Sequence, residues 1–285
     1  MFRSDVSKNA KESEPLMKLT ALTYNTLFGG RDGVDDRRAR MQTGLINELR
    51  PDVFLMQEAK GFDANGGSLL YALEALIGMR GFLAVAPRTG QNVAIFVREP
   101  LRPVSFDSDG AHFHHALATL KVALPESQRL MTLMSAHLCP NGPVVRRREV
   151  AYLAVQAAPE NYTLLTGDFN AASPHDPEPE GFDALPAHHR ARYLAEDLQT
   201  ADRGVLAHLE SAGWVDVGHE LGASGLPTVP TPGFTGTEFA VMRCDYVMAS
   251  KALAACARSY QVIRTPVTDM ASDHYPVLAT FDVPQ

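Results

Sequence analysis

The chain has 285 residues, of which 45% are hydrophobic and 21% are charged, a composition typical of a globular protein with a substantial core. No run of about 18 apolar residues is present, and the first dozen residues lack an apolar stretch, which argues against a membrane-spanning helix and a secretory signal. The net charge of −7 argues against a broad basic face that clamps duplex DNA. We therefore expect a cytoplasmic protein, and we expect it to be a monomer.

The first residues of the chain differ in character from the rest. Residues 1–16 are mostly polar or charged and show no periodicity, so they cannot bury enough apolar surface to offset the entropy lost on ordering. We expect a disordered tail over residues 1–16 and one domain over residues 17–285. Three scattered cysteines, Cys139, Cys244 and Cys256, suggest neither a disulfide framework nor a zinc site, and we expect buried or half-buried thiols.

The first half of the domain alternates strands and helices. A strand over 19–23 is followed by a helix from 35 to 50, with Asp35 as its N-cap and Pro51 as its stop. A buried strand over 52–56 comes next, and then a helix that begins at Ser68 and ends near 78–81. Four closely spaced strands follow, at 82–85, 93–97, 103–106 and 115–122, which favours antiparallel hairpins.

The second half repeats this pattern. It contains a strand over 129–138, a helix over 145–157 and a buried strand over 162–165. Residues 171–200 show no clear period, and we expect a functional or mobile loop there, followed by a helix capped by Asp202. The last strands are expected at 245–248, 260–263 and 277–281. No strong linker divides the chain, so the two similar halves are expected to pack as layers of one domain.

Polar residues gather where the apolar strands end. The end of a strand is held by a rigid core, so side chains placed there can converge on one site. Any one of them alone is more often a turn residue, and their combination is what requires explanation. They are Asn25 after LTALTY, Glu58 after DVFLMQ, His137 in LMSAHL, Asp168 and Asn170 in YTLLTGDFN, and Asp273 and His274 before YPVLATF.

The ordered series YN, QE, AHL, GDFN, a later DY and SDHYP resembles the motifs of the endonuclease/exonuclease/phosphatase superfamily, over residues 17 to the C-terminus. GDFN after an apolar strand and SDHYP near the C-terminus are the specific signals. The resemblance implies a four-layer α/β sandwich, in which two mixed, largely antiparallel sheets pack face to face between outer helices. This agrees with the division into two halves.

The resemblance also implies roles for these residues in hydrolysis of a phosphate ester. Glu58 would be the principal ligand of Mg²⁺, with Mn²⁺ as a substitute, and Asn25 and Asp273 would complete or support that side. Asp168 would hold the attacking water, and Asn170 would contact a phosphate oxygen.

Two histidines complete the implied site. His137 and His274 would flank the phosphate and donate hydrogen bonds to its oxygens. Asp245, in RCDYVM, matches the family carboxylate that pairs with the final histidine, so we expect an Asp245–His274 dyad.

Two features depart from the DNA-repair members that the series resembles. His137 stands where abasic-site endonucleases usually place a tyrosine. The segment 176–197 carries six acidic residues against Arg190 and Arg192, and these acids would repel a DNA backbone if they faced it. The acids are Asp176, Glu178, Glu180, Asp183, Glu196 and Asp197.

Other candidates carry weaker signals. His112, His114 and His115 alternate along the strand expected near 115, where solvent-facing or hydrogen-bonded histidines are favoured over site residues. Arg146, Arg147 and Arg148 are favoured as a solvated helix face. The glycines at 29–33 have no phosphate-loop spacing and predict a flexible loop near Asn25. We keep His115, Arg31 and Arg147 as candidate substrate-binding residues.

These observations favour a metal-dependent phosphoesterase. A small phosphoester substrate, such as a nucleotide, a metabolite or a lipid headgroup, is placed ahead of nucleic acid because the chain offers few aromatics and an acidic loop. A DNA or RNA nuclease with the same site is the alternative. A non-catalytic binding protein on the same fold is less favoured because the site set is intact.

Overall fold

The computed structural model describes residues 15–126, 129–234 and 238–284. The tail expected over residues 1–16 lies outside this range except at its end. There, Leu16 is the first residue of strand β1 and pairs with Pro284. Within the described residues, no helix is long and apolar enough to cross a membrane.

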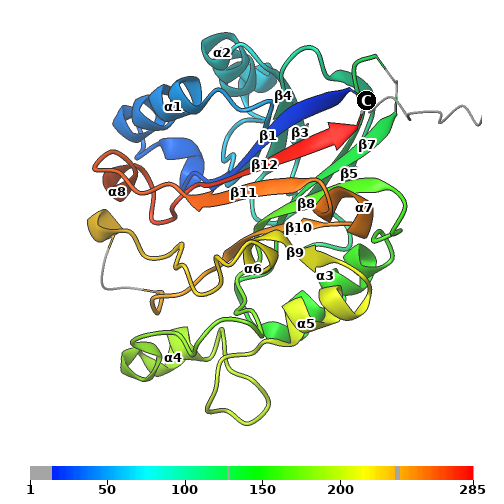
Figure 1. The fold of residues 1–285 in the computed structure, drawn as a ribbon. Helices are drawn as coiled ribbons and strands as arrows, with labels where there is room; N and C mark the ends of the chain where they lie inside the picture. Colours follow the sequence, from blue (N-terminus) through cyan, green and yellow to red (C-terminus); the bar gives the residue numbers. More distant parts are fainter. Residues whose placement is uncertain (1–14, 127–128, 235–237, 285) are drawn as a thin grey trace, which may run out of the picture.

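Two six-stranded sheets form the centre of the molecule (Figure 1). The first sheet has the strand order β11-β12-β1-β2-β4-β3, and the second has the order β5-β6-β7-β8-β10-β9. The strands of the first sheet are β1 (Leu16–Asn25), β2 (Val53–Gln57), β3 (Arg80–Ala84), β4 (Val93–Val97), β11 (Ala257–Val262) and β12 (Val277–Pro284). Those of the second are β5 (Arg102–Asp109), β6 (Leu117–Ala123), β7 (Leu130–His137), β8 (Tyr162–Asp168), β9 (Val215–Asp216) and β10 (Asp245–Ala249).

Four longer helices cover the outer faces of the sheets. Helices α1 (Arg37–Leu49) and α2 (Ser68–Ile77) lie on the first sheet, and α3 (Pro143–Ala154) and α5 (Gly204–Ser211) lie on the second (Figure 1). Short helices occupy the connections: α4 (Ala187–Arg190), α6 (Val217–Glu220), α7 (Lys251–Ala254) and α8 (Thr268–Ala271). Single 3-10 turns occur at Phe28–Gly30, Asn65–Gly67, Phe182–Ala184 and Pro232–Phe234. The expected four-layer α/β sandwich is confirmed.

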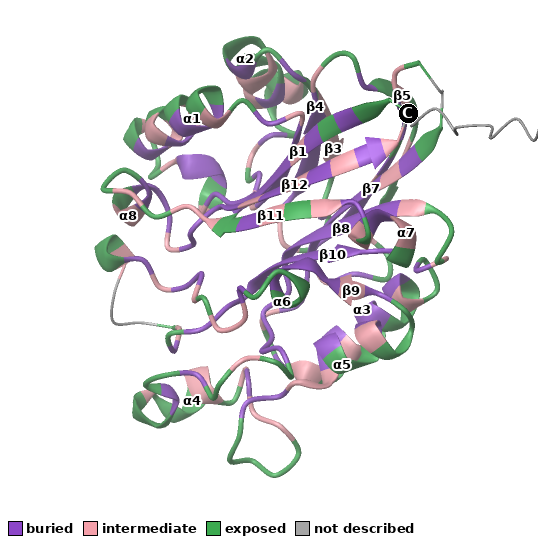
Figure 2. Ribbon diagram, viewed as in Figure 1, coloured by how far each residue is buried: buried purple, intermediate pink, exposed green. Residues whose placement is uncertain are grey.

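Each layer boundary is filled by its own apolar cluster. The largest cluster lies between the two sheets and includes Leu55 of β2 and Leu133 of β7. A second cluster joins α1 and α2 to the first sheet, and a third joins α3 and α5 to the second. Figure 2 shows the buried strands in the middle and the exposed outer faces of the helices. The layered packing explains why the fully apolar run 53–56 is a strand: one of its faces packs against the second sheet and the other against the helices.

The elements agree with the expected ones, but the expected helix caps are wrong. The N-cap of α1 is Asp36, although Asp35 Oδ1 does accept the backbone N–H of Arg37 at 2.8 Å. The N-cap of α2 is Gly67, which has the left-handed conformation, so Ser68 is the first helical residue. The N-cap of α5 is Arg203, and Asp202 instead receives Arg147.

One further expectation needs correction. His115 lies in a bend before β6, which begins at Leu117, so the three histidines do not alternate along a strand. The segment 171–200, expected to be a functional or mobile loop, contains one 3-10 turn and α4, and polar contacts join it to the rest of the domain.

Candidate active site

The sheet registers bring the ends of six strands to one place. In the first sheet, the parallel pairing of β1 and β2 sets Asn25 beside Gln57, the residue before Glu58. In the second sheet, the parallel pairing of β7 and β8 sets His137 beside Asp168, which pairs in turn with Asp245 of β10. His274 precedes β12, the neighbour of β1. The packing of the two sheets therefore assembles the motif residues from both halves.

Gly167, before the aspartate of GDFN, is required by the close approach of β7. Its φ of 144° is one that side chains rarely adopt, and a Cβ at this position would lie 1.8 Å from the carbonyl oxygen of Ala136. Only glycine allows β8 to deliver Asp168 beside His137 in this register.

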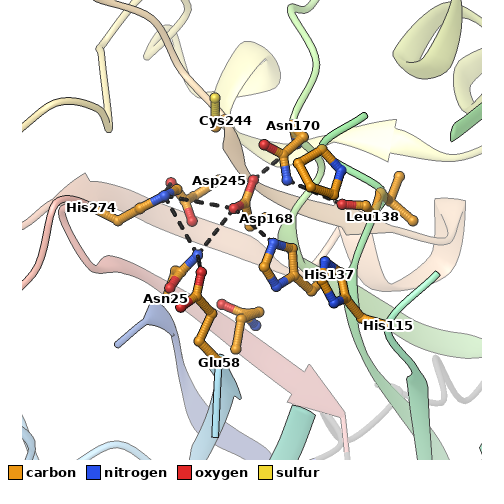
Figure 3. A network of polar contacts seen from close by, with 12 residues as sticks. Asn25, Glu58, His115, His137, Leu138, Asp168, Asn170, Cys244, Asp245 and His274 are labelled. Carbon is orange, nitrogen blue, oxygen red and sulfur yellow. Dashed lines mark hydrogen bonds and ion pairs between the residues drawn. The ribbon is translucent and has the colours of Figure 1, made fainter. Parts of the chain in front are cut away.

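Three side chains converge on one oxygen of Asp168 (Figure 3). The Oδ2 atom accepts a hydrogen bond from Asn25 Nδ2 at 3.0 Å, and it lies 3.4 Å from His137 Nε2 and 3.6 Å from His274 Nε2. The other oxygen, Oδ1, accepts the backbone N–H of Asn170 at 2.9 Å. All four partners and Asp168 itself are buried. One carboxylate is thus the shared centre of the polar cluster.

The expected contact between Asp245 and His274 is present. Asp245 Oδ2 lies 2.8 Å from His274 Nδ1, and both residues are buried. Burial alone would lower the pKa of His274, but the carboxylates of Asp245, Asp168 and Asp273 together raise it well above its ordinary value. The ring is therefore held as an imidazolium at neutral pH, with Nε2 toward Asp168 and Asn25.

His137 is electrostatically the opposite of His274. Burial, with the positive charge of His274 beside it, lowers the pKa of His137 to about 3, so its ring is neutral over the working pH range. Its Nδ1 atom is buried and has no hydrogen-bond partner. The ring of His115 stacks on it, with 4.1 Å between the ring centroids (Figure 3). The cluster thus combines one charged and one neutral imidazole.

Glu58 approaches the cluster from the first sheet. Its φ of 59° is left-handed, a strained conformation for a glutamate that is more frequent at functional sites. Its Oε1 accepts a hydrogen bond from Asn25 Nδ2 at 3.3 Å, and its Oε2 accepts one from the backbone N–H of Phe28 at 3.0 Å. Burial and the nearby negative charge of Asp273 raise the pKa of Glu58 to about 7.

The carboxylate oxygens on the first-sheet side of the cluster fit a hard cation. Glu58 and Asp273 are both only partly buried, unlike the rest of the cluster, and their mutual repulsion would be relieved by a positive ion between them. Asn25 contacts Glu58 through Nδ2 at 3.3 Å, while its amide oxygen accepts the backbone N–H of Leu27 at 3.1 Å. Among the described residues, no group of three or more histidine, cysteine or carboxylate side chains could hold a metal. A site with two carboxylates and water ligands matches what Mg²⁺ accepts, whereas it is poor for zinc.

Asn170 completes the cluster from the second sheet. It also has a left-handed backbone, with a φ of 49°, which asparagine tolerates better than most residues. Its Nδ2 donates to the carbonyl oxygen of Leu138 at 3.1 Å, and its buried Oδ1 has no partner. An amide that is buried and only half satisfied is available for a ligand atom.

The three arginines after His137 have unlike environments. Arg146 is fully buried, donates to the carbonyl oxygens of Cys139 and Arg192, and lies over the ring of Tyr193, so the expected solvated face is wrong for this residue. Arg147 pairs with Glu196 and Asp202 and ties α3 to the segment 171–201. Arg148 is exposed, as expected.

The acidic residues of that segment are largely paired. Asp176 binds the buried guanidinium of Arg243, and Glu178 binds Arg203. Glu196 binds Arg147, and Asp197 accepts hydrogen bonds from its own turn. Asp183 lies 3.8 Å from Arg190. The segment is therefore far less negative toward a substrate than its composition suggests.

Arg31, a candidate substrate-binding residue, belongs to another part of the first sheet's helical layer. Arg31 borders a small cavity between α1 and α2, and no contact joins its side chain to the cluster within the described residues. The structure adds two residues that were not expected near the cluster: Thr89, which orients His115, and the buried Glu149, which accepts the backbone N–H groups of His114 and Cys139. No motif marks these residues. The three cysteines are free and buried, as expected.

The sequence matches one family of known proteins. The model of the Endonuclease/Exonuclease/phosphatase family matches residues 22–274. No curated protein matches the sequence significantly.

Several solved structures share the fold. An AP endonuclease from Archaeoglobus fulgidus is 20% identical, with a TM-score of 0.67 over 93% of this chain and 100% of the other. TDP2 from D. rerio, complexed with single-strand DNA product, is 17% identical, with a TM-score of 0.65 over 93% and 99%. A mannosyl-6-phosphatase from Bacteroides thetaiotaomicron is 16% identical, with a TM-score of 0.64 over 93% and 99%. At these identities the likeness shows the fold alone. Because the family model spans most of the chain, the protein belongs to the endonuclease/exonuclease/phosphatase family.

Proposed function

We propose that the protein is a Mg²⁺-dependent phosphoesterase, with Mn²⁺ as a substitute, that hydrolyses a phosphodiester or phosphomonoester by in-line attack of water. The carrying observation is the convergence of Asn25, His137 and His274 on the Oδ2 atom of Asp168. A buried carboxylate surrounded by donors can hold a water and accept its proton while the donors face the phosphoryl oxygens.

The metal belongs on the side of the cluster built by the first sheet. Glu58 is the principal ligand in our proposal, with Asp273 beside it, because these two carboxylates lie at the less buried edge; the buried Asn25 supports Glu58 through the hydrogen bond from its Nδ2. When bound, Mg²⁺ would neutralise charge on the phosphoryl group and the leaving oxygen.

The protein groups divide the remaining work. Asp168 orients the attacking water and receives its proton. Asn170 can donate to a phosphoryl oxygen through the second N–H of Nδ2, the one not given to Leu138, and the imidazolium of His274 faces the developing negative charge. Asp245 keeps the ring of His274 in place through the 2.8 Å contact to Nδ1. His137, being neutral, contributes hydrogen bonding rather than charge.

The substrate is proposed to be a small phosphoester such as a nucleotide, a metabolite or a lipid headgroup, and the protein to be a cytoplasmic monomer. The net charge of −7 supports a small substrate over nucleic acid. The pairing of the acids in 176–197 with arginines removes one argument against nucleic acid. A nuclease therefore remains the second candidate, since the similar solved structures include an AP endonuclease and TDP2 complexed with single-strand DNA product.

A substrate panel tests the proposal. Plasmid DNA, RNA, bis(4-nitrophenyl) phosphate and phosphomonoesters are assayed side by side in Mg²⁺, with EDTA and with Asp168→Asn as controls. We expect hydrolysis that EDTA abolishes, that Mg²⁺ or Mn²⁺ restores and that Asp168→Asn lacks. Full activity in EDTA would exclude the metal mechanism, and no hydrolysis of any substrate would favour a binding protein.

A further inference from the structure

His115 is built into the edge of the cluster in a way that the proposed reaction leaves unexplained. The residue is 4% exposed and its ring stacks on that of His137, on the side away from Asp168 (Figure 3). Its Nδ1 lies 2.8 Å from Thr89 Oγ1, whereas its Nε2 is buried and has no hydrogen-bond partner. A buried polar atom without a partner is costly, so Nε2 requires a partner from outside the chain, either a water or a ligand atom.

The bend that carries His115 is fixed by the same residue that fixes the loop after His137. Glu149 of α3 accepts the backbone N–H of His114 through one oxygen, at 2.6 Å, and that of Cys139 through the other, at 2.8 Å. The two stacked rings therefore stand on loops that are tied to one carboxylate. Such second contacts preorganise a binding group.

The contact with Thr89 bears on which ring nitrogen of His115 carries the proton. Thr89 Oγ1 accepts the backbone N–H of Gln91 at 3.3 Å, and its own hydroxyl hydrogen can be donated to His115 Nδ1 at 2.8 Å in the tautomer that leaves Nδ1 unprotonated. Burial and the neighbouring rings of His137 and His114 lower the pKa of His115 to about 2, so the ring is neutral and has a single N–H. We assign that proton to Nε2, the tautomer in which Thr89 donates to Nδ1, and Nε2 is then a donor without an acceptor.

An unpaired donor beside a phosphoryl site favours a substrate with an additional phosphoryl oxygen. A phosphodiester has two non-bridging oxygens and one negative charge, whereas a phosphomonoester has three such oxygens and almost two charges at neutral pH. Resting on the proposed phosphoesterase function, we infer that His115 Nε2 donates to the third non-bridging oxygen, so the site prefers phosphomonoesters to phosphodiesters.

The test compares two substrates with the same leaving group, 4-nitrophenyl phosphate and bis(4-nitrophenyl) phosphate, in Mg²⁺. His115→Ala should lower kcat/KM for the monoester by about 10- to 100-fold, the size of one hydrogen bond to a charged group, and should change that for the diester by less than about threefold. His115→Gln places an amide N–H near the position of Nε2 and should restore part of the loss. His115→Asn, the matched control, places its amide near Nδ1 and should restore nothing.

Binding of inorganic phosphate gives a readout that does not depend on turnover. The dissociation constant of phosphate, measured by calorimetry with Mg²⁺, should rise about tenfold in His115→Ala and recover in His115→Gln. Thermal unfolding of each variant reports whether it is folded. Equal losses for monoester and diester would show that His115 only supports the ring of His137, and this would overturn the inference.

The two proposals fail in different ways. If the wild type hydrolyses either ester in Mg²⁺ but His115→Ala leaves the ratio of the two kcat/KM values unchanged, the inference fails and the phosphoesterase proposal stands. If the wild type hydrolyses neither ester, the phosphoesterase proposal fails for these substrates. Phosphate binding then decides the role of His115, and equal affinity in wild type and His115→Ala excludes it.

Discussion

The carboxylate of Glu58 is expected to destabilise the metal-free protein. Its pKa rises from 4.5 to about 7 on folding because of burial and the charge of Asp273. A carboxyl whose folded pKa is raised costs stability above its unfolded pKa, and the cost is complete once the pH exceeds the folded pKa. The difference corresponds to a cost of about 3 kcal/mol at pH 8. Glu58→Gln removes it but weakens the bond from the Phe28 N–H, worth about 1 kcal/mol.

We therefore expect Glu58→Gln to raise the free energy of unfolding by about 2 kcal/mol in EDTA at pH 8, measured by urea denaturation. The gain should shrink steadily between pH 7 and pH 5. Adding Mg²⁺ should stabilise the wild type by mass action and leave the variant almost unchanged. A variant that is less stable than wild type at pH 8, or a difference that does not vary with pH, would refute the burial argument. Equal stabilisation of both by Mg²⁺ would remove Glu58 from the metal site.

Three further predictions concern the surroundings of the cluster. His274→Ala should lower kcat by about 10² to 10⁴-fold, and Asp245→Asn should lose much of the same factor. Their double variant should be little worse than His274→Ala, and multiplying losses would disprove the dyad. Gly167→Ala should unfold at a markedly lower temperature in calorimetry, because its Cβ collides with the neighbouring strand. Arg243→Ala leaves Asp176 and Asp216 buried without their cation, and should cost about 3 to 5 kcal/mol in urea denaturation.

The positions of the motif residues were predictable because they depend on strand ends. Apolar runs that stop at Asn25, His137 and Asp168 fix where each buried strand leaves the core, and parallel pairing of neighbours then sets these ends side by side. The pairing of Asp245 with His274 came from the resemblance alone. Nothing in the sequence between them indicates that a strand start and a loop 29 positions later meet.

The environments of individual side chains were much less predictable. Arg146 follows two valines and precedes two more arginines, a pattern typical of a charged surface, yet its guanidinium is buried because two backbone carbonyls and an aromatic ring surround it. The helix caps failed for a similar reason. Asp202 has the residue type of an N-cap, but an arginine from α3 binds its carboxylate, and a charged partner outcompetes a backbone N–H.

The charge of the segment 171–201 shows why substrate class does not follow from local composition. Its acids predict repulsion of an anionic substrate only if they are unpaired. Asp176 is instead bound by Arg243, which lies 67 positions away and which no local pattern connects to it. Long-range pairing thus cancels much of the charge that the sequence shows. The proposed discrimination between phosphomonoesters and phosphodiesters therefore rests on a neutral donor, Nε2 of His115, which is among the buried polar atoms without a partner.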